Sequence, residues 1–300
     1  MMAAHPEESC GKRMAVVVGC NYPKTQFQLH GCINDALSMA DLLVKRMGFD
    51  PLNIELLIDD HGHDHALMGM PTGENVKKAL GRMIDCAQSG DVLFFHFSGH
   101  GTRTKSHHFR EGEAIVPCRF NINVDFKLLV NRLPKGATFT ILSDSCHSGG
   151  LIDQEKEQIG PSSSSSCLTQ NKPKFIPYEA IVQHLSGFGD KDGAEFNFKS
   201  AVAVGTNWNG DGGILLSGCE AKESSMDIPG NGANGSRPHG AFTDAVVREL
   251  SAAGVPIMIS NRELVMRVRD LLKKEKIIQQ HPCLYSTDQN ARSIFLGLPT

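Results

Sequence analysis

Short apolar runs alternate with amphipathic segments along the first half of this 300-residue chain. The runs at 14–20, 54–58, 91–97 and 138–142 have the length and composition of buried strands. Apolar residues recur at helical spacing in 33–47 and 72–87, and a shorter helix is expected at 125–133. Because alternating strands and helices favour right-handed crossovers, the pattern predicts a mostly parallel α/β sheet covered by helices on both faces.

The second half of the chain divides at a polar, serine-rich stretch. A serine run at 162–166 opens a segment that favours a flexible linker over 157–200, with a weakly apolar island at 175–185 that can hold a helix. Strand patterns return at 214–219 and 283–285, with helical patterns between them, one opened by the capping box of Ser260 and Glu263. We expect regions 1–156 and 201–300 to share one six-stranded sheet.

Composition excludes several classes of partner and compartment. A net charge of −3 gives no reason to expect nucleic acid or an anionic membrane as a partner. The first twelve residues carry Glu7 and Glu8 and no apolar run, so no secretory signal is expected there. Nine cysteines without a C-x-x-C pair indicate neither a disulfide framework nor a zinc ribbon. We expect a chain of the reducing cytoplasm, or of the nucleus.

One histidine and one cysteine follow predicted strands at equivalent points. His100 comes just after the run at 91–97, and Cys146 just after the run at 138–142. The carboxyl ends of parallel strands meet at the ligand-binding edge of an α/β sheet. An imidazole there lowers the pKa of a neighbouring thiol, so the pair predicts a nucleophile and its base. Main-chain N–H groups at Gly101 and Cys146 would stabilise an oxyanion. Otherwise Cys146 is a core thiol and His100 a loop histidine.

Two carboxylates are expected near this pair. Asp144 ends the same strand that leads to Cys146, and Asp35 lies at the start of the helix after the first strand. Asp35 alone would be explained as a carboxylate at a helix N-terminus. Two carboxylates beside a thiolate repel it unless a cation joins them, so we predict a pocket for an Arg or Lys side chain.

Five segments together resemble the metacaspases, more narrowly the plant type II metacaspases with a short linker. The likeness is close over 13–156, good over 213–298 and weak in the linker. The matching segments are Val18–Pro23, Leu29–Asp35, Phe97–Arg103, Asp144–Gly150 and Gln280–Pro282.

The resemblance implies a caspase–haemoglobinase-like three-layer α/β sandwich and a cysteine endopeptidase that cuts after Arg or Lys. It implies His100 and Cys146 as the catalytic dyad, and a specificity pocket of Asp35 and Asp144 with Cys32 and Ser98 beside them. It further implies a monomeric zymogen, acting in programmed cell death, with a large region 1–156, a self-cleaved linker 157–200 and a small region 201–300.

The lysines of the linker are the candidates for self-cleavage. They are Lys156, Lys172, Lys174, Lys191 and Lys199. Lys172 precedes Pro173, whose ring and missing N–H hinder cleavage. The context Phe175-Ile176-Pro177 favours Lys174, while Lys191 lies in another glycine-rich, polar setting.

The chain departs from calcium-activated relatives after the catalytic histidine. Calcium takes six to eight oxygen ligands, several of them carboxylates. The stretches 105–113 and 121–125 carry too few acids for this. We expect no metal and no cofactor, with activity independent of calcium, and the histidines of the first stretch suggest an acidic pH optimum.

Other functions would also fit parts of the sequence. His61, His63 and His65 could bind a metal but are more simply solvated. A cysteine phosphatase needs an Arg where Ile152 stands, and no G-x-S-x-G elbow occurs at a strand end. A catalytically silent relative that only binds partners would keep the same fold. Cys32 is either a packed thiol or a redox-active one.

Overall fold

The computed structural model of the chain describes residues 11–60, 69–105, 111–119, 126–146, 151, 157–159, 172–187, 213–220, 223–230, 236–252 and 258–297.

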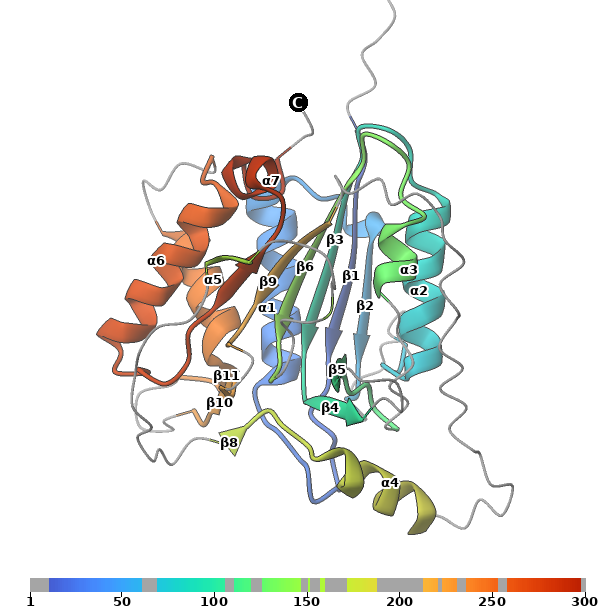
Figure 1. Cartoon of the computed structure of the whole chain (residues 1–300), viewed down its shortest axis with the longest axis vertical. Coiled ribbons are helices and arrows are strands. Elements are labelled where there is room, and N and C mark those ends of the chain that lie inside the picture. Colours follow the sequence, from blue (N-terminus) through green and yellow to red (C-terminus); the bar gives the residue numbers. More distant parts are fainter. Residues whose placement is uncertain are drawn as a thin grey trace, which may run out of the picture.

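A seven-stranded sheet forms the centre of the molecule (Figure 1). Five of its strands are parallel neighbours. Their order is β2 (Ile54–Ile58), β1 (Arg13–Gly19), β3 (Val92–Ser98), β6 (Thr138–Asp144) and β9 (Gly213–Ser217). Two short strands, β12 (Cys283–Tyr285) and β7 (Glu157–Ile159), continue the sheet in antiparallel pairing. The carboxyl ends of the five parallel strands therefore meet at one edge, the lower edge in Figure 1.

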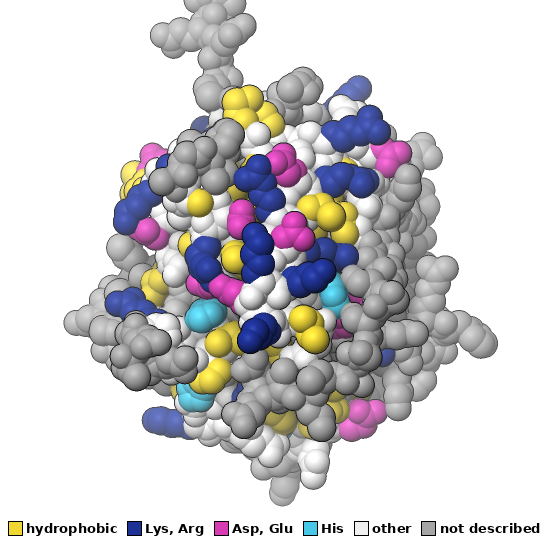
Figure 2. All heavy atoms as spheres, turned by 90° about the vertical axis from the view of Figure 1, so that its left-hand side faces the viewer, with side chains coloured by type: hydrophobic (Ala, Val, Ile, Leu, Met, Phe, Trp, Pro, Cys, Tyr) yellow, Lys and Arg dark blue, Asp and Glu magenta, His cyan; other side chains and the backbone are white. Residues whose placement is uncertain are grey.

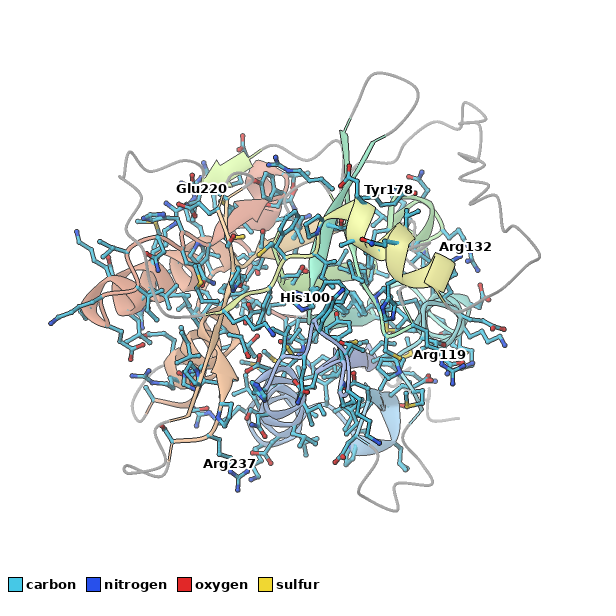
Figure 3. All side chains as sticks on the ribbon, turned by 90° about the horizontal axis from the view of Figure 1, so that it is seen from below. His100, Arg119, Arg132, Tyr178, Glu220 and Arg237 are labelled. Carbon is cyan, nitrogen blue, oxygen red and sulfur yellow. The ribbon has the colours of Figure 1, made fainter. Side chains whose placement is uncertain are left out.

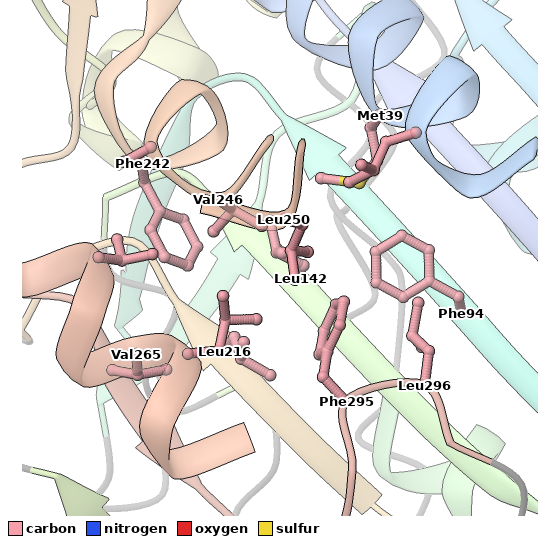
Figure 4. Close-up of a cluster of buried hydrophobic side chains, with 14 of the residues drawn as sticks. Met39, Phe94, Leu142, Leu216, Phe242, Val246, Leu250, Val265, Phe295 and Leu296 are labelled. Atoms are coloured by element: carbon pink, nitrogen blue, oxygen red, sulfur yellow. The ribbon is translucent and has the colours of Figure 1, made fainter. Parts of the chain in front are cut away.

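Helices cover both faces of the sheet and make three layers. One face packs against α2 (Gly73–Asp85) and α3 (Phe126–Val130), and the other against α1 (Cys32–Met47), α5 (Ala241–Ser251) and α6 (Asn261–Lys274). Alternate residues of β1 face the two layers: Val16 and Val18 belong to the first apolar cluster, Ala15 and Val17 to the second. Figure 4 shows the second cluster, where side chains of α5, α6 and the C-terminal segment meet those of the strands.

Smaller elements gather at the lower edge of the sheet. The hairpin of β4 (Gly101–Lys105) and β5 (Glu111–Ile115) leaves β3 directly. A small sheet joins β8 (Lys172–Pro173), β10 (Met226–Ile228) and β11 (His239–Gly240), and α4 (Tyr178–Gly187) lies below the β4–β5 hairpin. The remaining elements are a 3-10 turn at Pro51–Asn53 and α7 (Asp288–Arg292).

The predicted α/β architecture is confirmed, with additions to its sheet. All six expected strands are present, and β7 adds a seventh at the start of the segment that we expected to be linker. That segment also contains β8 and α4, the latter over the apolar island at 175–185. Its short pieces are ordered by their partners: β7 pairs with the edge strand β12, and β8 pairs with β10.

The outer face of α5 and α6 is charged. Figure 2 shows Lys and Arg side chains mixed with Asp and Glu over this side of the molecule. Arg267 pairs with Glu263 at 2.5 Å, and Arg248 pairs with Asp244 at 3.2 Å. Within the described part of the chain, no helix combines the length and the apolar character needed to cross a membrane.

Candidate active site

The two strand ends singled out from the sequence lie side by side. β3 and β6 are neighbours, and their last residues, Ser98 and Asp144, face each other in register. His100 and Cys146 each follow two positions later. A Cβ on Gly101 would lie 1.7 Å from the carbonyl oxygen of Cys146, so only glycine allows the two segments to approach this closely. Figure 3 looks onto this edge of the sheet, with His100 near its middle.

His100 is held in a defined orientation. Its ring Nε2 lies 2.7 Å from the carbonyl oxygen of Phe27, and its backbone N–H donates to the Tyr22 hydroxyl at 2.8 Å. A carbonyl can only accept, so Nε2 carries the hydrogen and Nδ1 has the free lone pair. Among the described residues, Nδ1 has no hydrogen-bond partner. Burial lowers the pKa of His100 to about 4, so the ring is neutral at physiological pH.

Cys146 lies fully buried beneath the segment around Lys174. Its sulfur accepts a hydrogen bond from the Ser225 N–H at 3.2 Å and lies 3.7 Å from the Ser225 carbonyl oxygen. Its own backbone N–H donates to the Lys174 carbonyl oxygen at 3.2 Å. The same oxygen accepts from the Gly101 N–H at 2.9 Å. Both main-chain donors predicted for an oxyanion thus meet at one carbonyl of the chain itself.

The side chain of Lys174 fills the acidic pocket. Its ammonium Nζ lies 3.1 Å from Asp144 Oδ1, 3.4 Å from Asp35 Oδ2 and 3.0 Å from Ser98 Oγ. The whole side chain is excluded from solvent. Three oxygen acceptors match the three hydrogens of an ammonium group.

The charges of this pocket depend on one another. Burial disfavours the ammonium of Lys174, yet Asp144, Cys32 and Asp35 outweigh it and raise the pKa of Lys174 above its usual value. Burial would likewise raise the pKa of Asp144, but Lys174 and the donors of Ser225 and Thr243 hold it below its usual value. Burial raises the pKa of Asp35 to about 6 despite Lys174. At neutral pH the pocket therefore favours a bound cation.

Several residues that orient the carboxylates were not identified from the sequence. Thr243 donates to Asp144 Oδ2 from its backbone N–H and its hydroxyl, both at 2.9 Å, and the Ser225 hydroxyl donates to Asp144 Oδ1. The Gly240 N–H donates to both oxygens of Asp35, at 2.8 and 2.9 Å. These partners come from the far side of the linker and carry no local motif.

A third buried carboxylate, in β10, and an amide from the segment before β12 also support the pocket. Asp227 accepts the backbone N–H groups of His30 and Gly31, both at 2.9 Å, and so fixes the turn that leads into α1. The Gln280 amide donates to Ser225 Oγ at 3.0 Å, while its oxygen accepts the Met226 N–H at 3.0 Å. Gln280 belongs to one of the segments that carry the resemblance, but no role could be predicted for it from the sequence.

Cys32 lies at the rim of the same pocket as a buried thiol. Burial raises the pKa of Cys32 well above its usual value, although the charge of Lys174 and a hydrogen bond with the Ser98 side chain oppose this shift. A redox-active cysteine needs an exposed sulfur of low pKa, so the packed thiol fits this surrounding better.

Some candidates lie outside the described residues. These are His61, His63, His65, Lys156, Lys191, Lys199 and Ile152. Within the described residues, Glu220, Glu223 and His281 bring metal-ligating atoms within 4.8 Å of one another. His281 Nδ1 already lies 2.6 Å from Glu223 Oε1, and Arg269 lies 3.7 Å from Glu220, so groups of the protein itself already contact both carboxylates.

Comparison with known proteins agrees with this geometry. Residues 12–292 match the caspase domain family. Metacaspase-9 of Arabidopsis thaliana is 45% identical, with 96% of this chain and 98% of that protein aligned. Metacaspase-6 of the same plant is 30% identical, covering 95% of this chain and 99% of that protein.

Solved structures show the same fold at low identity. A Geobacter sulfurreducens protein superposes with a TM-score of 0.63 at 17% identity, covering 96% of this chain and 100% of that chain. Caspase-1 of Spodoptera frugiperda superposes with a TM-score of 0.52 at 12% identity, covering 97% and 92%. With the sequence matches, they show that the chain belongs to the caspase-domain family of cysteine peptidases, as a plant type II metacaspase.

Proposed function

We propose that this cysteine peptidase cuts peptide bonds after Lys or Arg, and that it cuts its own chain after Lys174. The observation that carries the proposal is the placement of Lys174. Its side chain lies between Asp35 and Asp144 while its carbonyl oxygen accepts from the Gly101 and Cys146 N–H groups. A residue whose side chain lies in the specificity pocket and whose carbonyl lies in the oxyanion site has the position of the residue before a cut bond.

The proposed reaction uses groups that are already near this carbonyl. The Cys146 sulfur attacks the carbonyl carbon of Lys174 as its proton passes to Nδ1 of His100. The negative charge that forms on the carbonyl oxygen is stabilised by the two N–H donors. His100 then gives the proton to the nitrogen of Phe175, whose bond to Lys174 breaks and leaves an acyl-enzyme. Water, activated by His100, hydrolyses the acyl-enzyme and restores the thiol.

The pocket supports selection of a cationic side chain. Its two carboxylates are buried and lie close together, so an apolar or acidic side chain would leave at least one charge without a partner. Lys174 satisfies the site through single hydrogen bonds from its ammonium. Arg would present a planar fork suited to two carboxylate oxygens, so both cations are proposed substrates.

Self-processing follows from the same placement. Because Lys174 occupies the pocket, the uncut chain blocks its own site, and the bond after Lys174 must be cut, or the segment must move, before another substrate enters. We propose region 1–156 as the large catalytic region, 157–200 as the linker that is cut, and 201–300 as the small region. The pocket draws Asp144 from the first and Thr243 from the last.

Four versions of the full chain test the proposal. The unmodified chain is expected to yield two fragments, one ending at Lys174 and the other beginning at Phe175. Their intact masses identify them. Cys146→Ala should stay whole, and Lys174→Gln should not be cut at this position. Lys172→Gln is the matched control, because Lys172 is exposed and precedes Pro173, which hinders cleavage after it. Cleavage after Lys174 should be unchanged in this variant.

A peptide ending in Arg before a fluorogenic amide tests cleavage of other chains. The processed enzyme should hydrolyse it, while Cys146→Ala should not. If neither the peptide nor the chain itself were cut, the alternative of a catalytically silent protein that only binds partners would explain the result better.

A further inference from the structure

We propose that the site has a second specificity pocket, which takes an aliphatic side chain at the second residue after the cut bond. In this chain Ile176 fills it. The inference rests on the proposed function, because it takes Lys174 as the residue before the cut. It adds a requirement on the leaving side of the substrate, where the acidic pocket has no influence.

The backbone of this segment is fixed by Gly101. The Gly101 N–H donates to the Lys174 carbonyl at 2.9 Å, and the Gly101 carbonyl accepts the Ile176 N–H at 3.1 Å. The two bonds enclose Phe175, which forms a parallel β-bridge with Gly101. The glycine that holds the carbonyl to be attacked therefore also sets the register of the residues that leave.

Burial alternates along the same segment. Lys174 and Ile176 are completely buried, Phe175 between them is half-buried, and Pro177 is exposed. In an extended chain, residues two apart point to the same side. The side chain at 176 is thus directed into the protein on the same side as the lysine.

The surroundings of Ile176 are apolar. It belongs to the first apolar cluster, which includes Leu29 from the turn before α1, Ile115 at the end of β5 and Val116 just after it. The same cluster contains Ile181 of α4, so the segment after the cut is anchored at two points. A charged side chain at position 176 would lose its hydration without gaining a polar partner.

Peptides matching residues 171–179, Asn-Lys-Pro-Lys-Phe-Ile-Pro-Tyr-Glu, test the pocket without α4. They are offered to the processed enzyme, and kcat/KM is measured by mass spectrometry. Replacing the Ile by Ala removes three carbons, which at full burial is worth about 50-fold, so a loss of at least about tenfold is expected. Asp at this position should be cut more slowly still. Ala in place of the exposed Pro is the matched control and should change the rate by less than about threefold, since little buried surface is lost.

A fluorogenic Lys amide separates the two proposals, because it has no residues after the cut. If the amide is hydrolysed but all peptides react equally, or the parent peptide is not cut, the second pocket is refuted and the proposed function stands. If neither the amide nor any peptide is cut, both fail.

The intact chain gives a second measurement. Ile176→Asn should slow cleavage after Lys174 by about tenfold or more. Val182→Asn changes an exposed aliphatic residue of the same segment and should not slow it. Thermal unfolding of both variants in the Cys146→Ala chain shows whether either is misfolded. Equal cleavage of two folded variants would contradict the pocket.

Discussion

At the scale of single residues, Ser98 joins the acid and the cation of the pocket. Its hydroxyl donates to Asp35 Oδ2 at 2.6 Å and accepts from the Lys174 ammonium at 3.0 Å. Ser98→Ala should remove one contact to the substrate cation and leave the Asp35 oxygen less satisfied. A hydrogen bond to a charged group is worth about 1.5–3 kcal/mol, so we expect KM for a Lys peptide to rise at least about tenfold.

The kinetics of Ser98→Ala separate binding from chemistry. Because Ser98 does not contact the carbonyl to be attacked, kcat should stay within about threefold. Ser286→Ala is the control. It also removes a fully buried hydroxyl, just after β12, and should leave KM unchanged. A fall in kcat with a normal KM would show that Ser98 acts on the dyad and not on the cation.

His96 provides a pH-dependent contribution to stability. It is fully buried next to Thr243, and burial lowers the pKa of His96 to about 3. In the unfolded chain the value returns to about 6.5. The unfolded chain thus binds a proton that the folded chain excludes. This contribution is complete above about pH 6.5 and is lost as the pH falls from there towards 3, amounting to ~2 kcal/mol by about pH 5.

His96→Gln in the Cys146→Ala chain tests this contribution. Gln can still donate to Thr243 but has no titrating ring. Urea unfolding at about pH 7.5 and 5 should show that the loss of unfolding free energy on acidification is ~2 kcal/mol smaller in the variant. Asp35, whose pKa is raised to about 6 by burial, acts with the opposite sign, but it is present in both chains and cancels. An identical pH dependence would mean that His96 is not neutral and desolvated in the folded chain.

At the scale of elements, strands and helices long enough to carry a periodic pattern were predictable. The six strands and the helices α1, α2, α5 and α6 lie where their apolar residues indicated. β7, β8 and β11 were not predictable, because their two or three residues form no apolar run, unlike those of the equally short β12, and they exist only through their partners.

The candidate site divides along the same line. His100, Cys146, Asp35 and Asp144 follow or precede elements that the sequence makes visible. Ser225, Thr243 and Gln280 come from loops and helix ends distant in the chain, and only the folded sheet brings them to Asp144 or its neighbours.

The start of α6 allows a prediction about stability alone. Ser260 is the N-cap, and its hydroxyl accepts the Glu263 N–H at 3.1 Å. Ser260→Ala should lower the free energy of unfolding by about 1 kcal/mol, and Ser260→Asp should largely preserve it. The denaturant midpoint in the Cys146→Ala chain measures the effect. Hydrolysis of the Arg peptide by otherwise unmodified chains should not change, since α6 does not contribute to the pocket; reduced hydrolysis would contradict a purely structural role.

At the scale of the whole molecule, activity is expected without calcium. The stretches 105–113 and 121–125 contain few carboxylates, and a calcium ion requires several. Arg-peptide hydrolysis should therefore be the same with added calcium and with a chelator, at several pH values. Activity that appears only with calcium would show that ligands come from elsewhere in the fold.

If the chain is cut at Lys174 as proposed, the order of the sheet determines how the two fragments behave. β9 and β12 belong to the second fragment, yet they lie between β6 and β7 of the first. Pairing continues across both junctions, and the apolar cluster beneath them joins α5 and α6 to β3 and β6 (Figure 4). Separating the fragments would expose this cluster and the edges of two strands, which favours aggregation.

We therefore expect the cut enzyme to behave as one particle. On gel filtration both fragments should elute together, at the volume of the uncut Cys146→Ala chain, and they should separate only in denaturant. The cut enzyme should also unfold in a single transition, because the second apolar cluster draws residues from both fragments and their strands pair within one sheet. Fragments that elute apart while the Arg peptide is still hydrolysed would mean that the first fragment holds the pocket alone, which the contacts of Thr243 and Gly240 with its two carboxylates argue against.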